Sequence, residues 1–181
     1  MHGPVTLEQV IRFLLETPLF EGLGPAELAD VVSIMQVQRL RDGQTVFTEG
    51  DEGDAWYVVY EGGGIVTKDA GFGPPRVIAS LEPRGIFGEM SILDGSRRSA
   101  SVQARGETTL FRFRREDFDE LLGQETVAAY KLVHAMARLL CDRQRRLLAQ
   151  LAETIEAQSP EQKVNLRERL GGILDQSSLS D

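Results

Sequence analysis

The sequence has little of what metal sites and disulfides need. Its single cysteine, Cys141, cannot form an internal disulfide, and its two histidines, His2 and His134, lie far apart. These counts exclude a cluster of side chains with metal-ligand spacing, so we expect no metal. The N-terminus also lacks the basic and uninterrupted apolar regions of a secretory signal. Together these absences predict a reducing, cytoplasmic setting.

Long apolar runs and an excess of positive charge are missing as well. The longest apolar runs, such as Trp56 to Tyr60, are far shorter than the roughly 20 residues of a membrane-spanning helix. The chain has 20 Lys and Arg against 28 Asp and Glu, a formal net charge of −8. Because such a charge repels phosphate polymers and anionic lipid, we expect neither nucleic acid nor a membrane as a partner.

The remaining composition is that of an ordinary globular protein. Hydrophobic residues make up 41% and charged residues 27% of the 181 residues, which excludes wholesale disorder and permits a self-sufficient core. The sequence predicts short helices over residues 5–33, because apolar residues recur there at helical spacing: Val10, Ile11, Leu14 and Leu15. A second helix is expected to begin at Pro25, after Gly24.

From about residue 36 to 113, short β-type runs alternate with turn residues. The expected strands are Val37–Leu40, Thr45–Phe47, Trp56–Tyr60, Ile65–Thr67, Val77–Leu81, Ser101–Ala104 and Leu110–Phe113. Glycine-rich segments separate them, including 49–53, 61–64 and 105–107. Many short strands at this spacing predict a mainly β fold with flanking helices, most simply a β jelly-roll barrel.

Beyond Phe113 the pattern is helical. A short amphipathic helix is expected over 115–122 and a long one from Glu125 to about Gln158, followed by a short helix and a flexible tail. We therefore divide the chain into a domain at 5–123, a long helix at 124–158 and an end segment at 159–181. The long helix has apolar residues spaced alternately by four and three, with one polar member: Val133, Ala137, Leu140, Gln144, Leu147 and Leu151. This seam predicts a parallel coiled-coil homodimer; the alternative is packing on its own barrel.

The most informative stretch runs from Gly85 to Val102 and is interpreted as a loop rather than a strand. Gly88 permits close approach of the backbone, and residues 89–92 can form one helical turn whose free amides favour an anion. Arg98 can fork onto a phosphate, with the Ser99 hydroxyl beside it. Glu89 is a suitable acceptor for a sugar hydroxyl. The combination favours a ligand with both a sugar hydroxyl and a phosphate.

These residues resemble a known motif. Phe87-Gly88-Glu89-Met90-Ser91, followed by Arg98-Ser99-Ala100-Ser101-Val102, is similar to the phosphate-binding cassette of cyclic nucleotide-binding domains. That family includes catabolite activator-type regulators, regulatory subunits of cyclic-nucleotide-dependent kinases and cyclic-nucleotide-regulated channels. The resemblance extends over residues 14–122, through Gly43 to Asp54 and Tyr57 to Gly62, and the long helix after it resembles the family's lid helix.

The resemblance implies a role for each matching residue. Glu89 would bind the ribose 2′-hydroxyl and Arg98 the cyclic phosphate. Backbone amides near Gly88, Met90 and Ser91, with Ser99 and Ala100, would complete the phosphate cradle. The barrel wall facing the base would be formed by Val66, Ile78, Ala79 and Leu81, and the lid would contribute Arg143 and Gln144. The implied ligand is cAMP or cGMP, with no further cofactor.

Three departures from the family pattern affect these expectations. Arg97 stands where many members have a proline, so the inward-pointing arginine is ambiguous, although alignment with Ser99-Ala100 favours Arg98. Gly64 replaces an apolar strand residue, which would loosen that strand. The hydroxyl at Ser99 occurs in both cAMP-binding and cGMP-binding relatives, so the nucleotide stays open.

The resulting functional hypothesis is a stand-alone cyclic nucleotide receptor that reports to a partner protein. No nucleophile, metal cluster or acid–base pair indicates an enzyme, and no catalytic residue is expected. Residues 159–181 are too few and too polar for a helix-turn-helix module, so a transcription factor of the catabolite activator type is not expected. Two alternatives are a ligand-free scaffold on the same fold and a receptor for another nucleotide such as cyclic di-GMP.

Overall fold

The computed structural model describes residues 5–69, 71 and 73–156. The chain divides into two compact units, Met1–Ala137 and Arg138–Asp181. Among the described residues, the strands and the shorter helices lie in the first unit. The described part of the second is the continuation of one long helix, α5 (Val127–Glu156), which begins in the first unit. Over the described ranges, helices are either too short or too polar to cross a membrane.

The N-terminal segment forms the expected short helices: α1 (Leu7–Leu15), the 3-10 turn η1 (Pro18–Phe20) and α2 (Pro25–Ser33). A capping box fixes the start of α1, in which Gln9 N donates to Thr6 Oγ1 at 3.3 Å and Thr6 N donates to Gln9 Oε1 at 2.8 Å. Val10, Phe13 and Leu14 bury one face of α1. The prediction of short helices over residues 5–33 is confirmed.

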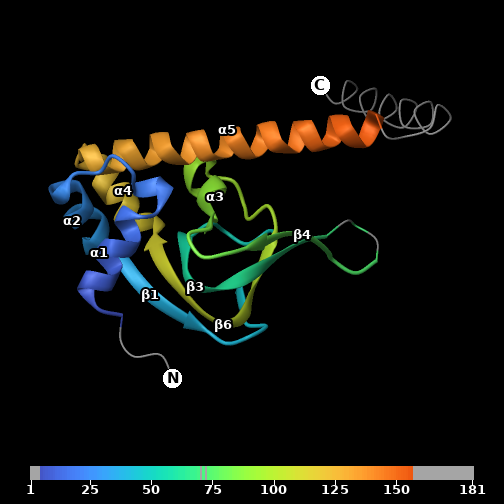
Figure 1. Cartoon of the computed structure of the whole chain (residues 1–181), viewed down its shortest axis with the longest axis horizontal. Coiled ribbons are helices and arrows are strands. Elements are labelled where there is room, and N and C mark those ends of the chain that lie inside the picture. The colour runs from blue at the N-terminus through green and yellow to red at the C-terminus, as the bar shows by residue number, and fades with distance from the viewer. Residues whose placement is uncertain (1–4, 70, 72, 157–181) are drawn as a thin grey trace. The chain divides into compact units, whose positions relative to one another are not determined.

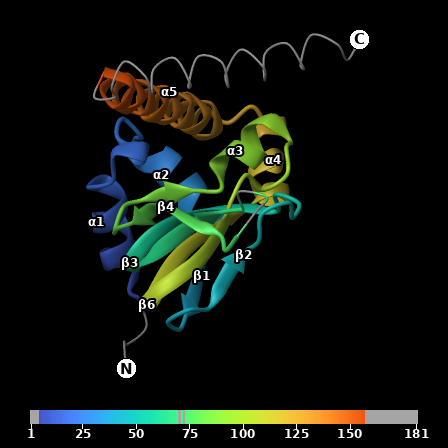
Figure 2. The same cartoon turned by 90° about the vertical axis from the view of Figure 1, so that its right-hand side faces the viewer.

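Six strands form one antiparallel sheet: β1 (Met35–Leu40), β2 (Thr45–Phe47), β3 (Ala55–Lys68), β4 (Arg76–Leu81), β5 (Ile86–Phe87) and β6 (Ser101–Arg114). The strand order is β1-β6-β3-β4, with β2 also paired to β6 and β5 to β3. The long strands β3 and β6 curve across the sheet, while α1, α2 and α4 (Arg115–Gly123) gather at the end where β6 finishes (Figures 1 and 2). The expected mainly β fold with flanking helices is confirmed.

Two glycine-containing segments predicted as turns lie inside strands instead. The separators 61–64 and 105–107 belong to β3 and β6, which pair continuously from Ala55↔Arg114 to Thr67↔Ser101 apart from two register shifts between Val59 and Gly63. Gly62 has φ +80°, and a Cβ there would lie 2.5 Å from the Glu107 carbonyl oxygen. Glycine here accommodates irregular pairing and close backbone contact, so the strand continues where a turn was expected.

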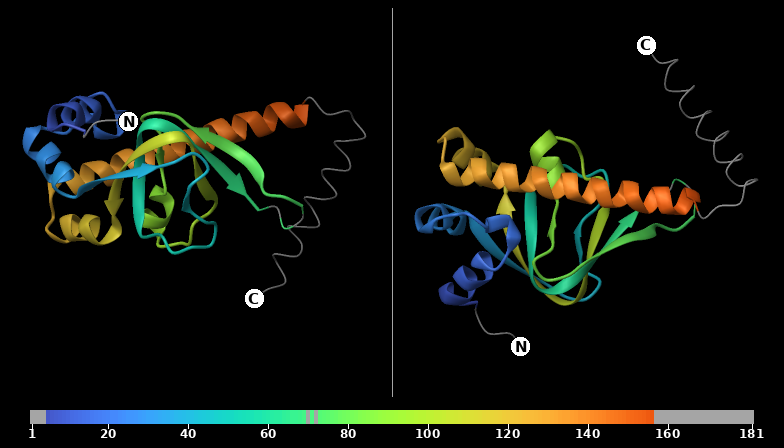
Figure 3. Two further views of the ribbon diagram at one scale, coloured as in Figure 1. Left: turned by 90° about the horizontal axis from the view of Figure 1, so that it is seen from below. Right: turned by 45° about the horizontal axis from the view of Figure 1, so that its top comes forward.

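The aromatic core joins the sheet to the helices at one end. Trp56 and Phe113, both fully buried, stack with ring centroids 4.0 Å apart, and Phe118 of α4 meets Trp56 edge-on at 6.1 Å. A second cluster inside the curved sheet includes Tyr57, Phe87 and Leu81, with Phe47 and Val66 packed against it. Phe87 of this cluster belongs to the stretch that contains the predicted phosphate-binding residues. Figure 3 shows the curve of the long strands from two further directions.

Helix α5 begins two residues later than predicted. Glu125 has φ +56°, a left-handed conformation incompatible with a helix, and Thr126 caps the start by accepting a hydrogen bond from Ala129 N at 3.3 Å. Lys131 then ties this helix to the N-terminal segment through Glu27 and the Gly22 carbonyl. The helix and tail predicted beyond Glu156 lie outside the described residues, and the predicted domain limits stay predictions.

Candidate functional site

The stretch predicted as a loop contains two short regular elements. Strand β5 pairs with β3 through Tyr57↔Phe87 and Val58↔Ile86, and the helix α3 (Glu89–Asp94) follows at once. Gly88 and Gly95 bound α3 with φ values of +77° and +73°. The interpretation as a loop was therefore wrong at the start of the stretch, where β5 forms, whereas the helical turn expected at 89–92 and the strand expected from Ser101 are both present.

Arg98 is the buried cation of this region. Its side chain is 1% exposed, and it lies over the Phe47 ring with the guanidinium carbon 4.1 Å from the centroid. Nη1 donates to the Gly88 carbonyl at 3.0 Å, while Nη2 donates to the Ala55 carbonyl at 2.7 Å and to Asp54 Oδ1 at 3.0 Å. Nε is buried without a hydrogen-bond partner among the described residues. A buried, charged donor without an acceptor is costly unless a ligand supplies one.

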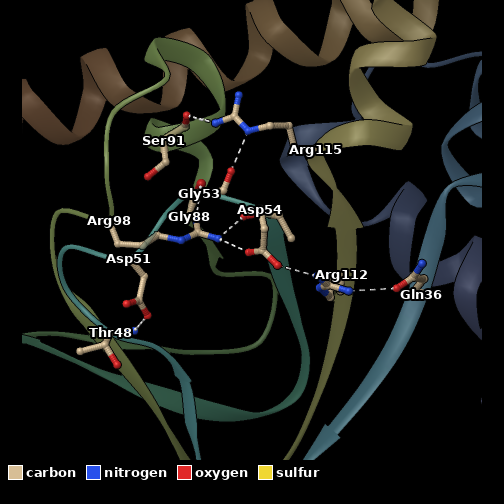
Figure 4. A network of polar contacts seen from close by, with 11 residues as sticks. Gln36, Thr48, Asp51, Gly53, Asp54, Gly88, Ser91, Arg98, Arg112 and Arg115 are labelled. Carbon is tan, nitrogen blue, oxygen red and sulfur yellow. Dashed lines mark hydrogen bonds and ion pairs between the residues drawn. The ribbon is translucent and has the colours of Figure 1, made fainter.

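Asp54 connects Arg98 to a second arginine. Its other carboxylate oxygen accepts from Arg112 Nη2 at 2.7 Å, and Arg112 also donates to Gln36 at 3.2 Å (Figure 4). Burial raises the pKa of Asp54, but the hydrogen bond and charge of Arg112 and the charge of Arg98 outweigh it, so the pKa lies below its ordinary value. Asp54 stays ionised and holds the Arg98 guanidinium in place.

Arg97 lies outside this network. It is exposed, and its Nη1 donates to the Gly50 carbonyl at 2.8 Å. The structure therefore places Arg98 on the interior side of the segment and Arg97 on the solvent side. This is the orientation that alignment with Ser99-Ala100 favours.

Helix α3 carries three of the predicted cassette residues, Glu89, Met90 and Ser91. Glu89 and Ser91 are buried, whereas Met90 is exposed. Arg115 of α4 anchors the helix, since it donates to the Ser91 carbonyl and, at 2.7 Å, to the Gly53 carbonyl. The segment after Arg98 has an exposed Ser99 and a buried Ala100. Glu89 and Arg98 are thus two buried ionisable side chains at opposite ends of one short segment.

The predicted wall residues differ in their surroundings. Leu81 is buried and Val66 packs against the same cluster. Ile78 and Ala79, on β4, are exposed. Gly64 pairs with Leu81 and Ala104, and a Cβ at Gly64 would lie 3.1 Å from Leu81 Cδ1. The Leu81 side chain therefore lies close beside Gly64, and the expectation that Gly64 loosens the strand stays a prediction.

Comparison with known proteins accounts for this arrangement. The sequence profile of the cyclic nucleotide-binding domain matches residues 37–125, which include β2, β3, α3 and Arg98. Over these residues the chain belongs to the cyclic nucleotide-binding domain family. The match contains every predicted cassette and wall residue; Arg143 and Gln144 lie beyond it, on the part of α5 in the second unit.

The relatives come from more than one branch of this family. The chain is 37% identical to the cyclic AMP receptor protein of Thermus thermophilus over 124 residues, 68% of this chain and 57% of that protein. It is 33% identical to the cAMP-dependent protein kinase regulatory subunit of Aspergillus niger over 111 residues, 61% of this chain and 26% of that protein. A cyclic nucleotide-binding domain from Methylobacillus flagellatus has a TM-score of 0.71 at 27% identity, covering 81% of this chain and 83% of that one.

The chain therefore spans just over half of the first protein and about a quarter of the second. What these relatives share with it is the nucleotide-binding domain. Sequence reasoning had not assigned roles to the residues that hold Arg98. Asp54 and Phe47 lay in segments already matched to the family, but only their contacts in the fold show that both meet the same guanidinium.

Proposed function

We propose that this chain is a receptor for cAMP or cGMP that binds the nucleotide in the cassette formed by residues 87–100. Arg98 binds the cyclic phosphate and Glu89 the ribose 2′-hydroxyl. The observation that carries the proposal is the buried Arg98 Nε, a charged donor that lacks an acceptor among the described residues. A phosphate oxygen supplies that acceptor through a charge-assisted hydrogen bond.

The other predicted contacts complete this proposal. The amides of Gly88, Met90, Ser91, Ser99 and Ala100 bind the phosphate oxygens, and Val66, Ile78, Ala79 and Leu81 face the base. Exposure of Ile78 and Ala79 is consistent with side chains that a ligand covers. The base is capped by Arg143 and Gln144 of α5, so that binding changes the position of this helix and signals to a partner protein.

The proposal also includes the assembly and the setting of the receptor. The seam along α5 pairs two copies as a homodimer, and the receptor acts in the cytoplasm without catalysing a reaction. Light scattering at tens of micromolar tests the first statement, with a dimer expected. A monomer both with and without nucleotide contradicts it.

Calorimetric titration tests nucleotide binding directly. We expect saturable binding of cAMP or cGMP and rejection of the 2′-deoxy analogue, because Glu89 loses its hydroxyl partner. Cyclic di-GMP is titrated in parallel. If the chain binds cyclic di-GMP more tightly than cAMP and cGMP, it is a receptor for that nucleotide instead. If it binds no cyclic nucleotide, it is a ligand-free scaffold.

The variants Arg98→Lys and Arg97→Lys form a matched pair for this test. Lysine keeps the charge at position 98 but cannot place a fork of donors on Asp54, Ala55 and the phosphate at once. The loss of one charge-assisted hydrogen bond, about 1.5 to 3 kcal/mol, weakens binding on the order of 10- to 100-fold. Arg97→Lys changes an exposed side chain, so its affinity stays near that of the wild type.

A further inference from the structure

The outer side of the cassette is held by residues from two other parts of the chain. The loop 48–51, which precedes β3, pairs with the segment that contains Arg98. Gly50 N donates to the Arg98 carbonyl at 2.9 Å, and Arg98 N donates to the Asp51 carbonyl at 2.8 Å. Glu49 N donates to Ser101 Oγ at 2.9 Å. This loop therefore holds the backbone of Arg98 on one side of Ser99 and the side chain of Ser101 on the other.

Lys68, the last residue of β3, adds the contact to Ser99 itself. Its Nζ donates to the Ser99 carbonyl at 2.7 Å and also to the Glu49 carboxylate. The second carboxylate oxygen of Glu49 accepts from Asp69 N at 3.0 Å. Hydrogen bonds from Lys68 and from Asp69 N lower the pKa of Glu49, which therefore stays ionised and keeps the ammonium group beside Ser99.

The geometry of the peptide bond links this outer contact to the inner side of the cassette. In a planar trans peptide the carbonyl and the following N–H point in opposite directions. Because Lys68 holds the Ser99 carbonyl, the N–H of Ala100 must point away from Lys68. Because Gly50 N holds the Arg98 carbonyl, the N–H of Ser99 must point away from Gly50. These are two of the amides assigned above to the phosphate.

We propose that Lys68, braced by Glu49, is a positioning residue for nucleotide binding, which orients the Ser99–Ala100 peptide so that the Ala100 N–H meets the phosphate. This inference rests on the proposed function. Lys68 acts through the peptide and does not itself touch the nucleotide. Its positive charge also polarises the Ser99 carbonyl, which makes the Ala100 N–H on the same peptide a stronger donor.

The test compares variants of this pair with a matched ion pair elsewhere in the full chain. Lys68→Met removes the ammonium group and keeps a similar length, while Lys68→Arg keeps the charge and the donors. Arg105 and Glu82 form a comparable exposed ion pair at 2.6 Å, so Arg105→Met is the control. The affinity for cAMP and cGMP is measured by calorimetry, and the backbone amide signal of Ala100 by NMR with and without nucleotide.

We expect Lys68→Met to weaken binding about tenfold and to reduce the nucleotide-induced shift of the Ala100 amide proton. Lys68→Arg and Arg105→Met should remain within about twofold of the wild type. Glu49→Gln should weaken binding less than Lys68→Met, and adding it to Lys68→Met should cause no further loss. Glu49→Gln also serves as the second variant if Lys68→Met does not fold.

The outcomes separate this inference from the proposed function. If the wild type binds no cyclic nucleotide, the proposed function fails whatever the variants do. If the wild type binds and Lys68→Met binds equally well, or if the Ala100 amide shifts as in the wild type, the positioning role is wrong. Equal losses in Lys68→Met and Arg105→Met likewise overturn it, because they indicate a general effect of surface charge.

Discussion

The two glycines that bound α3 allow the contact between Gly88 and Arg98 to be tested separately from backbone strain. Gly88 and Gly95 have nearly the same φ, +77° and +73°. A Cβ at Gly88 would lie 2.8 Å from Arg98 Nη1 and 3.3 Å from the Ala55 carbonyl oxygen, whereas a Cβ at Gly95 meets nothing within 4 Å. Alanine at either position therefore costs similar backbone strain, but only Gly88→Ala displaces the arginine.

The expected losses of stability and affinity follow from the backbone strain and from the displacement of Arg98. A left-handed conformation costs a non-glycine residue about 1 to 2 kcal/mol, so both variants should unfold at a lower temperature, by roughly 2 to 4 °C for each kcal/mol. Gly88→Ala must in addition break the 3.0 Å hydrogen bond from Arg98 Nη1 and shift the guanidinium. A loss of about 1.4 kcal/mol of binding free energy then gives a tenfold weaker affinity for the cyclic nucleotide.

The assay combines thermal unfolding with calorimetric titration of the wild type and both variants. Gly95→Ala should lose stability and keep an affinity within about twofold of the wild type. Gly88→Ala should lose both. Affinities that agree within twofold between the two variants would refute the reasoning, because displacement of Arg98 would then not affect the site.

Three further predictions concern the network and the core. Asp54→Asn should unfold at a lower temperature than the wild type at pH 7. Because the pKa of Asp54 is lowered in the folded protein, the stability that its carboxylate contributes is present above pH 3.8 and is lost as the pH falls through the folded pKa. The difference in melting temperature between variant and wild type should therefore be smaller at pH 3 than at pH 7, and an equal difference at both pH values contradicts this. Phe113→Ala should cost about 3 to 5 kcal/mol in urea unfolding, because Phe113 is fully buried against Trp56, whereas exposed Val37→Ala should change stability by about 0.5 kcal/mol or less. Lys131→Met should speed amide hydrogen exchange in the first turns of α5, because the contacts with Glu27 and Gly22 are lost, while Lys131→Arg should preserve protection.

The cassette could be predicted from the sequence because its parts are neighbours in the chain. Gly88, Glu89 and Arg98 lie within one short segment, and glycines at both ends of a helical turn are a local signal. The helical ends of the domain were predictable for the same reason, since apolar spacing and capping residues act over a few positions. None of these features depends on which distant segment packs beside them.

The partners of the cassette were decided by the tertiary structure. Asp54 reaches Arg98 from 44 residues away, and Lys68 reaches the Ser99 carbonyl from 31 residues away. An aspartate and a lysine in turn-rich segments look like ordinary surface residues in the sequence. The pairing of β3 with β6 sets the end of β3, and with it Lys68, beside Ser101. The pairing of β3 with β5 sets the start of β3, which follows Asp54, beside Phe87.

The sequence by itself determined at which positions glycine permits a sharp change in backbone direction, but not which structure each glycine forms there. Gly62 and Gly106 share a positive φ with Gly88 and Gly95, yet the first two lie inside continuous strands and the second two bound a helix. Glycine permits all of these conformations, so its position alone cannot choose among them. At Gly62 and Gly106 the conformation belongs to the pairing of β3 with β6, whose hydrogen bonds join residues far apart in the chain and exist only in the folded sheet.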